Sequence, residues 1–106
     1  MNKNQEILRS LKNHLVRNYG ENIKDVILFG SRAKGKSHEF SDYDVLIILS
    51  GSYSGKDQNT IFDLCYDIDL AHDILLDVHI ISDSELKTIR GRQPIFTNAL
   101  KSGVYA

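Results

Sequence analysis

Five consecutive aliphatic residues, 45–49, constrain the fold of this chain more than any other feature. Successive side chains of a strand point to opposite faces of a sheet, so both faces of this strand are apolar and both must be covered. A second apolar run, 26–29, ends at Gly30, and a third strand is expected over 74–81. Buried strands of this kind predict a mixed α/β sheet with helices packed against it.

Segments before, between and after these strands have apolar residues at helical spacing. An amphipathic helix is expected around residues 7–15, and a second one, beginning near Lys56, joins the second and third strands. The sequence 82–85 is a capping-box pattern that opens a short helix, and Pro94 suits the first turn of a last helix that stops at Gly103. The predicted order is therefore α, β, short α, β, α, β, α, α.

Length and composition indicate a single domain spanning residues 1–106. The content of 42% apolar and 25% charged residues is that of an ordinary globule, and the longest aliphatic run is far short of the roughly 20 residues that a membrane span requires. Cys65 is the single cysteine and cannot form an internal disulfide, which favours a reducing cytoplasm. A net charge of −1 leaves no global basic field, so stable nucleic-acid binding is not expected.

Residues 30–37 match the P-loop formula G-x-x-x-x-G-K-[ST] letter for letter, and 74–77 resembles a Walker B strand. Only residues 38–41 separate this loop from Asp42, where the next strand signal opens. A parallel crossover takes about a dozen residues or more, so a P-loop helix does not fit here. A short helix from Ser31 would instead return the chain as an antiparallel neighbour.

The same segment also reads as G-S-x10-D-x-D, from Gly30 and Ser31 to Asp42 and Asp44. Two aspartates two positions apart on a strand share a face, roughly 6.6 Å apart along the backbone. Mg²⁺ prefers such hard oxygen ligands, together with substrate phosphates. Asp77 supplies a third carboxylate if its strand lies beside the second, and three carboxylates suit two ions. Pairing of Asp77 with a nearby lysine is the structural alternative.

The Gly30–Ser31 turn provides the features of a phosphate site. Gly30 lets backbone come close to a phosphate, and Ser31 offers a hydroxyl and an N–H at a helix start. Arg32, Lys34 and Lys36 concentrate positive charge there, with solvated loop charges as the alternative reading.

These residues resemble the nucleotidyltransferase superfamily typified by DNA polymerase β, and in particular its minimal nucleotidyltransferases. The residues that carry the resemblance are Gly30, Ser31, Arg32, Gly35, Ser41, Asp42 and Asp44, with a weaker match at Asp77. The resemblance implies that Asp42 and Asp44 bind the catalytic Mg²⁺, that Asp77 completes the set and accepts the acceptor's proton, and that Gly30 and Ser31 hold the nucleotide phosphates. His79 is expected on the face of Asp77, and Asp73 is the alternative third carboxylate.

No segment is left over for an acceptor domain, so a partner protein is expected to present the acceptor. Minimal nucleotidyltransferases similar to this chain act as antitoxins beside a HEPN-domain ribonuclease toxin and transfer AMP from ATP to a toxin tyrosine. The resemblance implies the same reaction here. Transfer to a small hydroxyl compound and a purely binding antitoxin stay open as alternatives.

Overall fold

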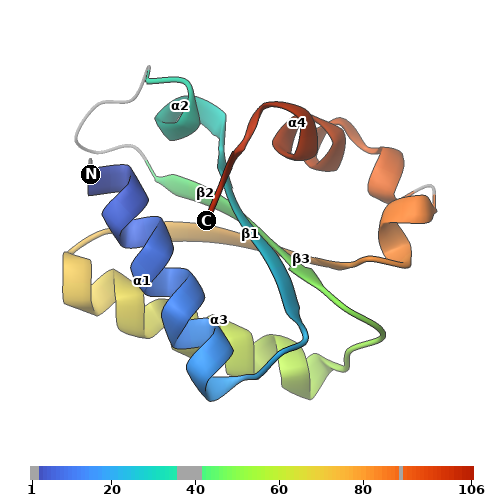
Figure 1. Ribbon diagram of the computed structural model, residues 1–106, viewed down its shortest axis with the longest axis horizontal. Helices are drawn as coiled ribbons and strands as arrows, with labels where there is room; N and C mark the ends of the chain where they lie inside the picture. The colour runs from blue at the N-terminus through green and yellow to red at the C-terminus, as the bar shows by residue number, and fades with distance from the viewer. Residues whose placement is uncertain (1–2, 36–41, 89) are drawn as a thin grey trace.

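One mixed sheet organises the part of the chain that the computed structural model describes, residues 3–35, 42–88 and 90–106 (Figure 1). The elements follow in the order α1 (Lys3–Asn18), β1 (Ile23–Phe29), α2 (Gly30–Ala33), β2 (Tyr43–Leu49), α3 (Gly55–His72), β3 (Leu76–Ser82), the 3₁₀ turns Glu85–Lys87 and Arg90–Arg92, α4 (Pro94–Ser102) and β4 (Val104–Tyr105). The expected mixed α/β class is confirmed, and so is the expected order, with the 3₁₀ turn Glu85–Lys87 in place of the short helix predicted after the third strand. The turn Arg90–Arg92 and β4 are additional elements.

The strands lie in the order β3-β2-β1-β4. Strands β2 and β3 are parallel, as α3 provides the long crossover that a parallel pair requires. Strand β1 is antiparallel to both β2 and β4. The short return after Gly30 therefore produces an antiparallel neighbour, as predicted, and the parallel geometry of a P-loop is excluded. Lys36 and Ser41 of the predicted phosphate loop lie outside the described residues.

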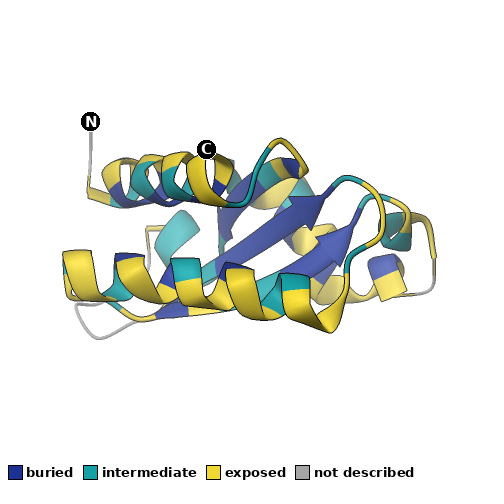
Figure 2. Ribbon diagram, turned by 90° about the horizontal axis from the view of Figure 1, so that it is seen from below, coloured by how far each residue is buried: buried dark blue, intermediate teal, exposed yellow. Residues whose placement is uncertain are grey.

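Helices cover both faces of the sheet, as the apolar run 45–49 requires. Helices α1 and α3 pack on one face, in a core that includes Leu11, Leu15, Val45, Ile47 and Ile61. Helix α4 packs on the other face, where Phe96 and Ala99 join a cluster of Ile27, Leu46, Ile48 and Ile81. Figure 2 shows the strands as a buried layer between helices whose outer faces are exposed. Cys65 is a buried residue of the first cluster, as expected from its place in the helical stripe.

Two capping boxes define where elements begin. Ser54 accepts a hydrogen bond from the backbone N–H of Asp57, and the Asp57 carboxylate accepts one from the N–H of Ser54, so α3 begins at Gly55. The predicted box at 82–85 is confirmed: the N–H of Glu85 donates to the Ser82 hydroxyl oxygen, and the N–H of Ser82 donates to the Glu85 carboxylate. The element that follows is a single 3₁₀ turn.

Strand ends differ from the expected ones by a few residues. Strand β1 begins at Ile23 rather than Val26, because Ile23 still pairs with Leu49. Strand β3 begins at Leu76 rather than Ile74, because Asp73 takes a left-handed conformation with φ 53° at the C-cap of α3. Strand β4 was not predicted, since two residues carry no periodicity.

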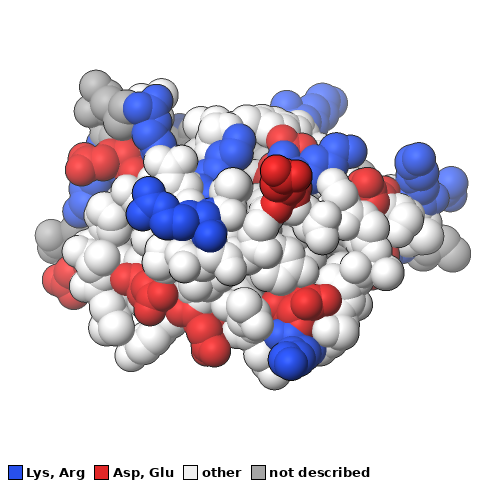
Figure 3. Space-filling model, turned by 60° about the horizontal axis from the view of Figure 1, so that its bottom comes forward, with Lys and Arg blue, Asp and Glu red and all other residues white. Residues whose placement is uncertain are grey.

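Within the described ranges, no helix combines the length and apolarity needed to cross a bilayer. On the face shown in Figure 3, basic and acidic side chains are interspersed, and neither sign forms a continuous stripe.

Candidate active site

Asp44 and Asp77 meet at the point where β2 and β3 begin. They are Cα partners in the parallel pair, and Phe29 is the partner of Asp44 on the other side, in β1. By strand alternation the Asp44 side chain shares the sheet face of Leu46, which is the face that α4 covers. Asp42 lies one residue before β2 and is exposed. The predicted third carboxylate is therefore brought beside Asp44 by the sheet.

The electrostatics of Asp44 reflect this crowding. The pKa of its carboxyl group lies above the ordinary value of 3.8, first because of burial and then because of the charge of Asp77 and a hydrogen bond with it. Asp42 raises this pKa further, while His79 opposes the shift. A cation bound between these carboxylates would offset the part of this shift that comes from the charges of Asp77 and Asp42.

His79 lies on the same face as Asp77, as predicted. Its Nε2 atom is 3.5 Å from Oδ2 of Asp77, and its ring centroid is 5.8 Å from that of Phe29, with the planes tilted by 54°. Asp73, the alternative third carboxylate, is not a strand residue but the exposed C-cap of α3. The sheet register thus favours Asp77 over Asp73.

The backbone of Gly30 lies directly beside the carboxylate of Asp44. It has φ +74°, and a Cβ atom built on it would collide with Oδ2 of Asp44. A glycine is required here on both counts, since it alone tolerates this φ freely and has no Cβ. The sequence predicts that Gly30 lets the backbone approach a phosphate, and the structure adds its proximity to the Asp44 carboxylate.

Gly30 is the first residue of α2, a single helical turn that ends at Ala33. Ser31 and Lys34 are exposed in this turn and at its C-cap. The guanidinium of Arg32 lies 4.1 Å from the ring centroid of Tyr43. Successive residues of a strand face opposite ways, so this guanidinium lies on the α1 side of the sheet and not beside Asp44. This arrangement does not bring Arg32 together with the carboxylates. The phosphate-binding role of Arg32 stays a prediction.

A pocket of about 220 Å³ opens between α2 and α4. It is lined by Phe29, Gly30, Ala33, Lys34, Asn98 and Ser102. Asn98 and Ser102 are not distinguished by the sequence, because two polar residues on an amphipathic helix look the same as an ordinary solvated face. Their spacing of four residues places them on one face of a helix. That face becomes part of a pocket only because α2 lies opposite it in the fold.

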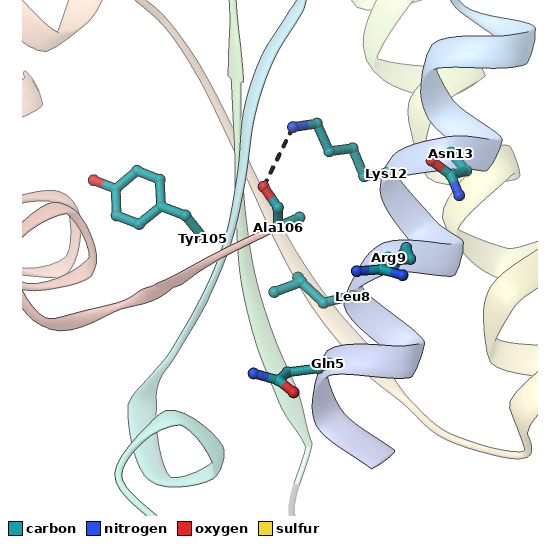
Figure 4. Close-up of a pocket in the computed structure, with 7 residues that line it drawn as sticks. All are labelled: Gln5, Leu8, Arg9, Lys12, Asn13, Tyr105 and Ala106. Atoms are coloured by element: carbon teal, nitrogen blue, oxygen red, sulfur yellow. Dashed lines mark hydrogen bonds between the residues drawn. The ribbon is translucent and has the colours of Figure 1, made fainter. Parts of the chain in front are cut away.

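A separate cavity of about 390 Å³ lies between α1 and β4. Figure 4 shows Arg9 and Lys12 of α1 at this cavity, with the ammonium of Lys12 donating to the carbonyl oxygen of Ala106 at 3.3 Å. It shares no lining residue with the pocket between α2 and α4. This cavity is therefore distinct from the candidate active site.

The carboxylates fit a magnesium site that substrate completes. Within 3–35, 42–88 and 90–106, no group of three or more His, Cys, Asp or Glu residues is placed to hold an ion by itself. Mg²⁺ is usually bound through one or two carboxylates plus substrate phosphates, and the donors at Asp44 and Asp77 are hard oxygens held side by side. The pairing of Asp44 with Asp77 is the observation that favours a cation, and the raised pKa of Asp44, caused first by burial and then by the charge of Asp77, agrees with it.

Comparisons with known proteins agree with this geometry. A family model described as "Polymerase beta, Nucleotidyltransferase" matches residues 9–102. A protein of Methanocaldococcus jannaschii named "Putative protein adenylyltransferase MJ0604" is 31% identical over 99 residues, which cover 93% of each chain.

Two solved structures share the fold. The crystal structure of a toxin-antitoxin MntA-HpeT mutant aligns with a TM-score of 0.62 at 16% identity, over 99% of this chain and 72% of that chain. The complex of tri-AMPylated Shewanella oneidensis HEPN toxin with MNT antitoxin aligns with a TM-score of 0.56 at 16% identity, over 96% of this chain and 70% of the other. With the family match over most of the sequence and paired carboxylates beside a Gly-Ser turn, the chain belongs to the polymerase beta nucleotidyltransferase family.

Proposed function

We propose that this protein is a Mg²⁺-dependent adenylyltransferase that acts as an antitoxin, transferring AMP from ATP to a tyrosine of a partner HEPN ribonuclease toxin. The observation that carries the proposal is the pairing of Asp44 with Asp77 across β2 and β3, next to the backbone of Gly30. The adenylyltransferase relative supports the transferred group. The solved complexes of similar fold, which contain toxin-antitoxin pairs, support the class of partner.

In this proposal Asp42, Asp44 and Asp77 are the residues that would hold two magnesium ions. When bound, magnesium neutralises phosphate charge and makes the attacking oxygen more nucleophilic. Gly30 and Ser31 offer backbone N–H groups and a hydroxyl to the phosphates, and the exposed ammonium of Lys34 adds positive charge.

The reaction is a displacement at the α-phosphorus of ATP. The tyrosine oxygen forms a bond to the α-phosphorus, the bond from that phosphorus to the bridging oxygen breaks, and pyrophosphate leaves with the electron pair. The tyrosine proton passes to the carboxylate of Asp77, whose side chain is 53% exposed and so accessible to a second substrate. The toxin gains a bulky anionic group, which would exclude RNA from a nearby ribonuclease centre by charge and volume.

The test is incubation of the protein with its cognate HEPN toxin, Mg²⁺ and ATP labelled at the α-phosphate. Label is expected on the toxin, on tyrosine, and Asp42→Asn and Asp44→Asn variants are expected to abolish it. Absence of label on the toxin with Mg²⁺ present contradicts the proposal. If label is absent while both variants still neutralise the toxin, the protein acts by masking; label on a small hydroxyl compound instead identifies the other alternative.

A further inference from the structure

Large apolar side chains are exposed along α3 and along its connection to β3. Of the seven that are exposed in the described part of the chain, four lie in this stretch: Phe62, Tyr66, Leu70 and Leu75. The first three are spaced four residues apart, so they form one stripe on the helix, which lies along the lower side of the fold in Figure 1. We call these four residues the outer α3 surface. An exposed apolar surface with a polar rim is typical of a contact with another protein.

Helix α3 is therefore apolar on two sides. Its buried stripe, formed by Ile61, Cys65 and Ile68, already covers the sheet. The exposed side chains of Tyr66 and Leu70, 59% and 65% accessible, contribute nothing to that core. A helix that is apolar beyond its core-facing stripe is typical of one that is covered on its other side as well.

Backbone hydrogen bonds fix the position of Leu75. The N–H of Ile74 donates to the carbonyl oxygen of Asp69 at 3.1 Å, and the N–H of Leu76 donates to the Asp69 carboxylate at 3.0 Å. The carbonyl oxygen of Leu75 accepts a hydrogen bond from the N–H of Tyr43 at 2.9 Å, at the beginning of β2. The outer α3 surface is thus held in place before a partner binds, and a preorganised surface loses less conformational entropy on binding.

The surroundings of this surface are acidic. Residues 57–86 contain eight of the 14 acidic side chains of the chain and no lysine or arginine. Three exposed carboxylates, Asp63, Asp67 and Asp73, lie on α3 or at its end. Asp67 pairs with His14 at 2.8 Å, while neither of the other two forms an ion pair among the described residues. The charge therefore favours a basic partner and opposes contact with the same surface of a second copy.

We infer that the outer α3 surface is where the acceptor protein docks, through the basic surface with which that ribonuclease binds RNA. The inference deepens the proposed function and rests on it, because the proposed function makes a ribonuclease the acceptor. RNA is bound largely through lysine and arginine contacts to its phosphates, so a ribonuclease carries the positive charge that this acidic surface lacks. Docking of this kind occupies the RNA-binding surface of the toxin before any AMP is transferred.

The outer α3 surface ends where the acceptor has to arrive. Strand β3 is an edge strand of the sheet, and the side chain of Asp77 on it is 53% exposed. Leu75 precedes Asp77 by two residues, and α4 covers the face of the sheet opposite to α3. A protein that covers Leu70 and Leu75 therefore lies next to the carboxylate that receives the tyrosine proton, without displacing α4.

The first test is titration calorimetry of the protein with its cognate HEPN toxin in the absence of ATP. Tyr66→Ala and Leu70→Ala shorten two side chains of the outer α3 surface, and Val16→Ala shortens an exposed apolar side chain of α1 as the matched control. Alanine favours helix at all three positions, and thermal unfolding checks that each variant is folded. Both surface variants are expected to weaken toxin binding by about tenfold or more, with the control within about twofold of the wild type.

A second pair of variants tests the charge of the partner. Asp63→Lys reverses an exposed charge on α3, and Glu21→Lys reverses an exposed charge between α1 and β1 as its control. Asp63→Lys is expected to weaken toxin binding by about fivefold or more at low ionic strength, and by less at high ionic strength, because salt screens exposed charges. Equal binding by these two variants at low ionic strength overturns the assignment of a basic partner surface.

Transfer of labelled AMP separates docking from chemistry. Tyr66→Ala is expected to raise KM for the toxin by about tenfold or more and to keep kcat within about twofold of the wild type. If Tyr66→Ala and Leu70→Ala bind and label the toxin as the wild type does, the inference is overturned and the proposed function stands. If both variants weaken binding but even the wild type transfers no AMP, the proposed function fails and the docking surface stands.

Two further outcomes also count against the inference. A wild-type dimer in light scattering that becomes a monomer in Tyr66→Ala, with toxin binding unchanged, assigns the outer α3 surface to a second copy of the chain. Absence of any binding between the wild type and the toxin contradicts the inference and the proposed function together.

Discussion

Asp44 and Asp77 are Cα partners across the parallel pair of β2 and β3, although α3 separates them in the sequence. The pairing sets two carboxylates side by side at the beginning of both strands. The pKa of Asp44 is raised first by burial and then by the charge of Asp77 and a hydrogen bond with it. Like charges placed side by side repel each other, and a bound cation would offset that repulsion, which supports the proposed role of this pair in metal binding.

Replacing Asp77 tests whether Asp77 or Asp73 is the third carboxylate of the site. Asp77→Asn is expected to lower the rate of AMP transfer by about 100-fold or more, because the amide neither accepts the acceptor's proton nor carries charge. Asp73→Asn is the matched control: the residue is exposed, and asparagine tolerates its left-handed φ of 53°. Its transfer rate is expected to equal that of the wild type. The reverse result would move the third carboxylate to Asp73.

Gly30→Ala separates steric contact from backbone strain. Gly30 and Gly35 have nearly the same φ, +74° and +69°. An added Cβ meets the carboxylate of Asp44 at Gly30, while at Gly35 it meets none of the described residues within 4 Å. Alanine at Gly35 is expected to cost about 1 kcal/mol of unfolding free energy. Alanine at Gly30 is expected to cost at least about 1 kcal/mol more, as measured by urea denaturation. Equal losses would show that Asp44 moves away freely.

The raised pKa of Asp44 predicts a pH dependence with a definite sign. Between the ordinary value of 3.8 and the raised value, the folded protein binds more protons at this group than the unfolded chain does. The contribution of Asp44 to the free energy of unfolding therefore falls as pH rises through that window. In denaturation without Mg²⁺, Asp44→Asn should be the more stable protein by a margin that grows with pH and then levels off. A margin that shrinks with rising pH contradicts this assignment.

Cys65 is expected to be unreactive in the folded protein. The residue is 2% exposed, and burial, followed by the charge of Asp69, raises the pKa of its thiol to about 12. Thiolate, the reactive form, is then scarce at pH 8. Reaction with a disulfide reagent at this pH should be slow in buffer and fast in denaturing urea. Rapid reaction of the folded protein would show that α3 opens readily from the sheet.

Local patterns in the sequence predicted most of the elements and indicated the candidate residues Gly30, Asp42 and Asp44. Alternation in the run 45–49 predicted a strand covered on both faces, and the short interval before Asp42 predicted an antiparallel return. The G-S-x10-D-x-D spacing indicated which residues could carry the chemistry. Each of these inferences depends on neighbours close in the chain, where periodicity and the minimum length of a connection decide the outcome.

What the sequence alone determined about this protein is thus its elements, its class and the types of residue offered to a site. Tertiary packing decided which of them meet: the order β3-β2-β1-β4 puts Asp77 against Asp44, the Tyr43 ring holds Arg32 on the opposite face, and α4 brings Asn98 to the pocket beside Gly30. Contacts of this kind join segments far apart in the chain, and the free energy that selects them comes from burying both faces of the sheet at once, which no single stretch of sequence encodes.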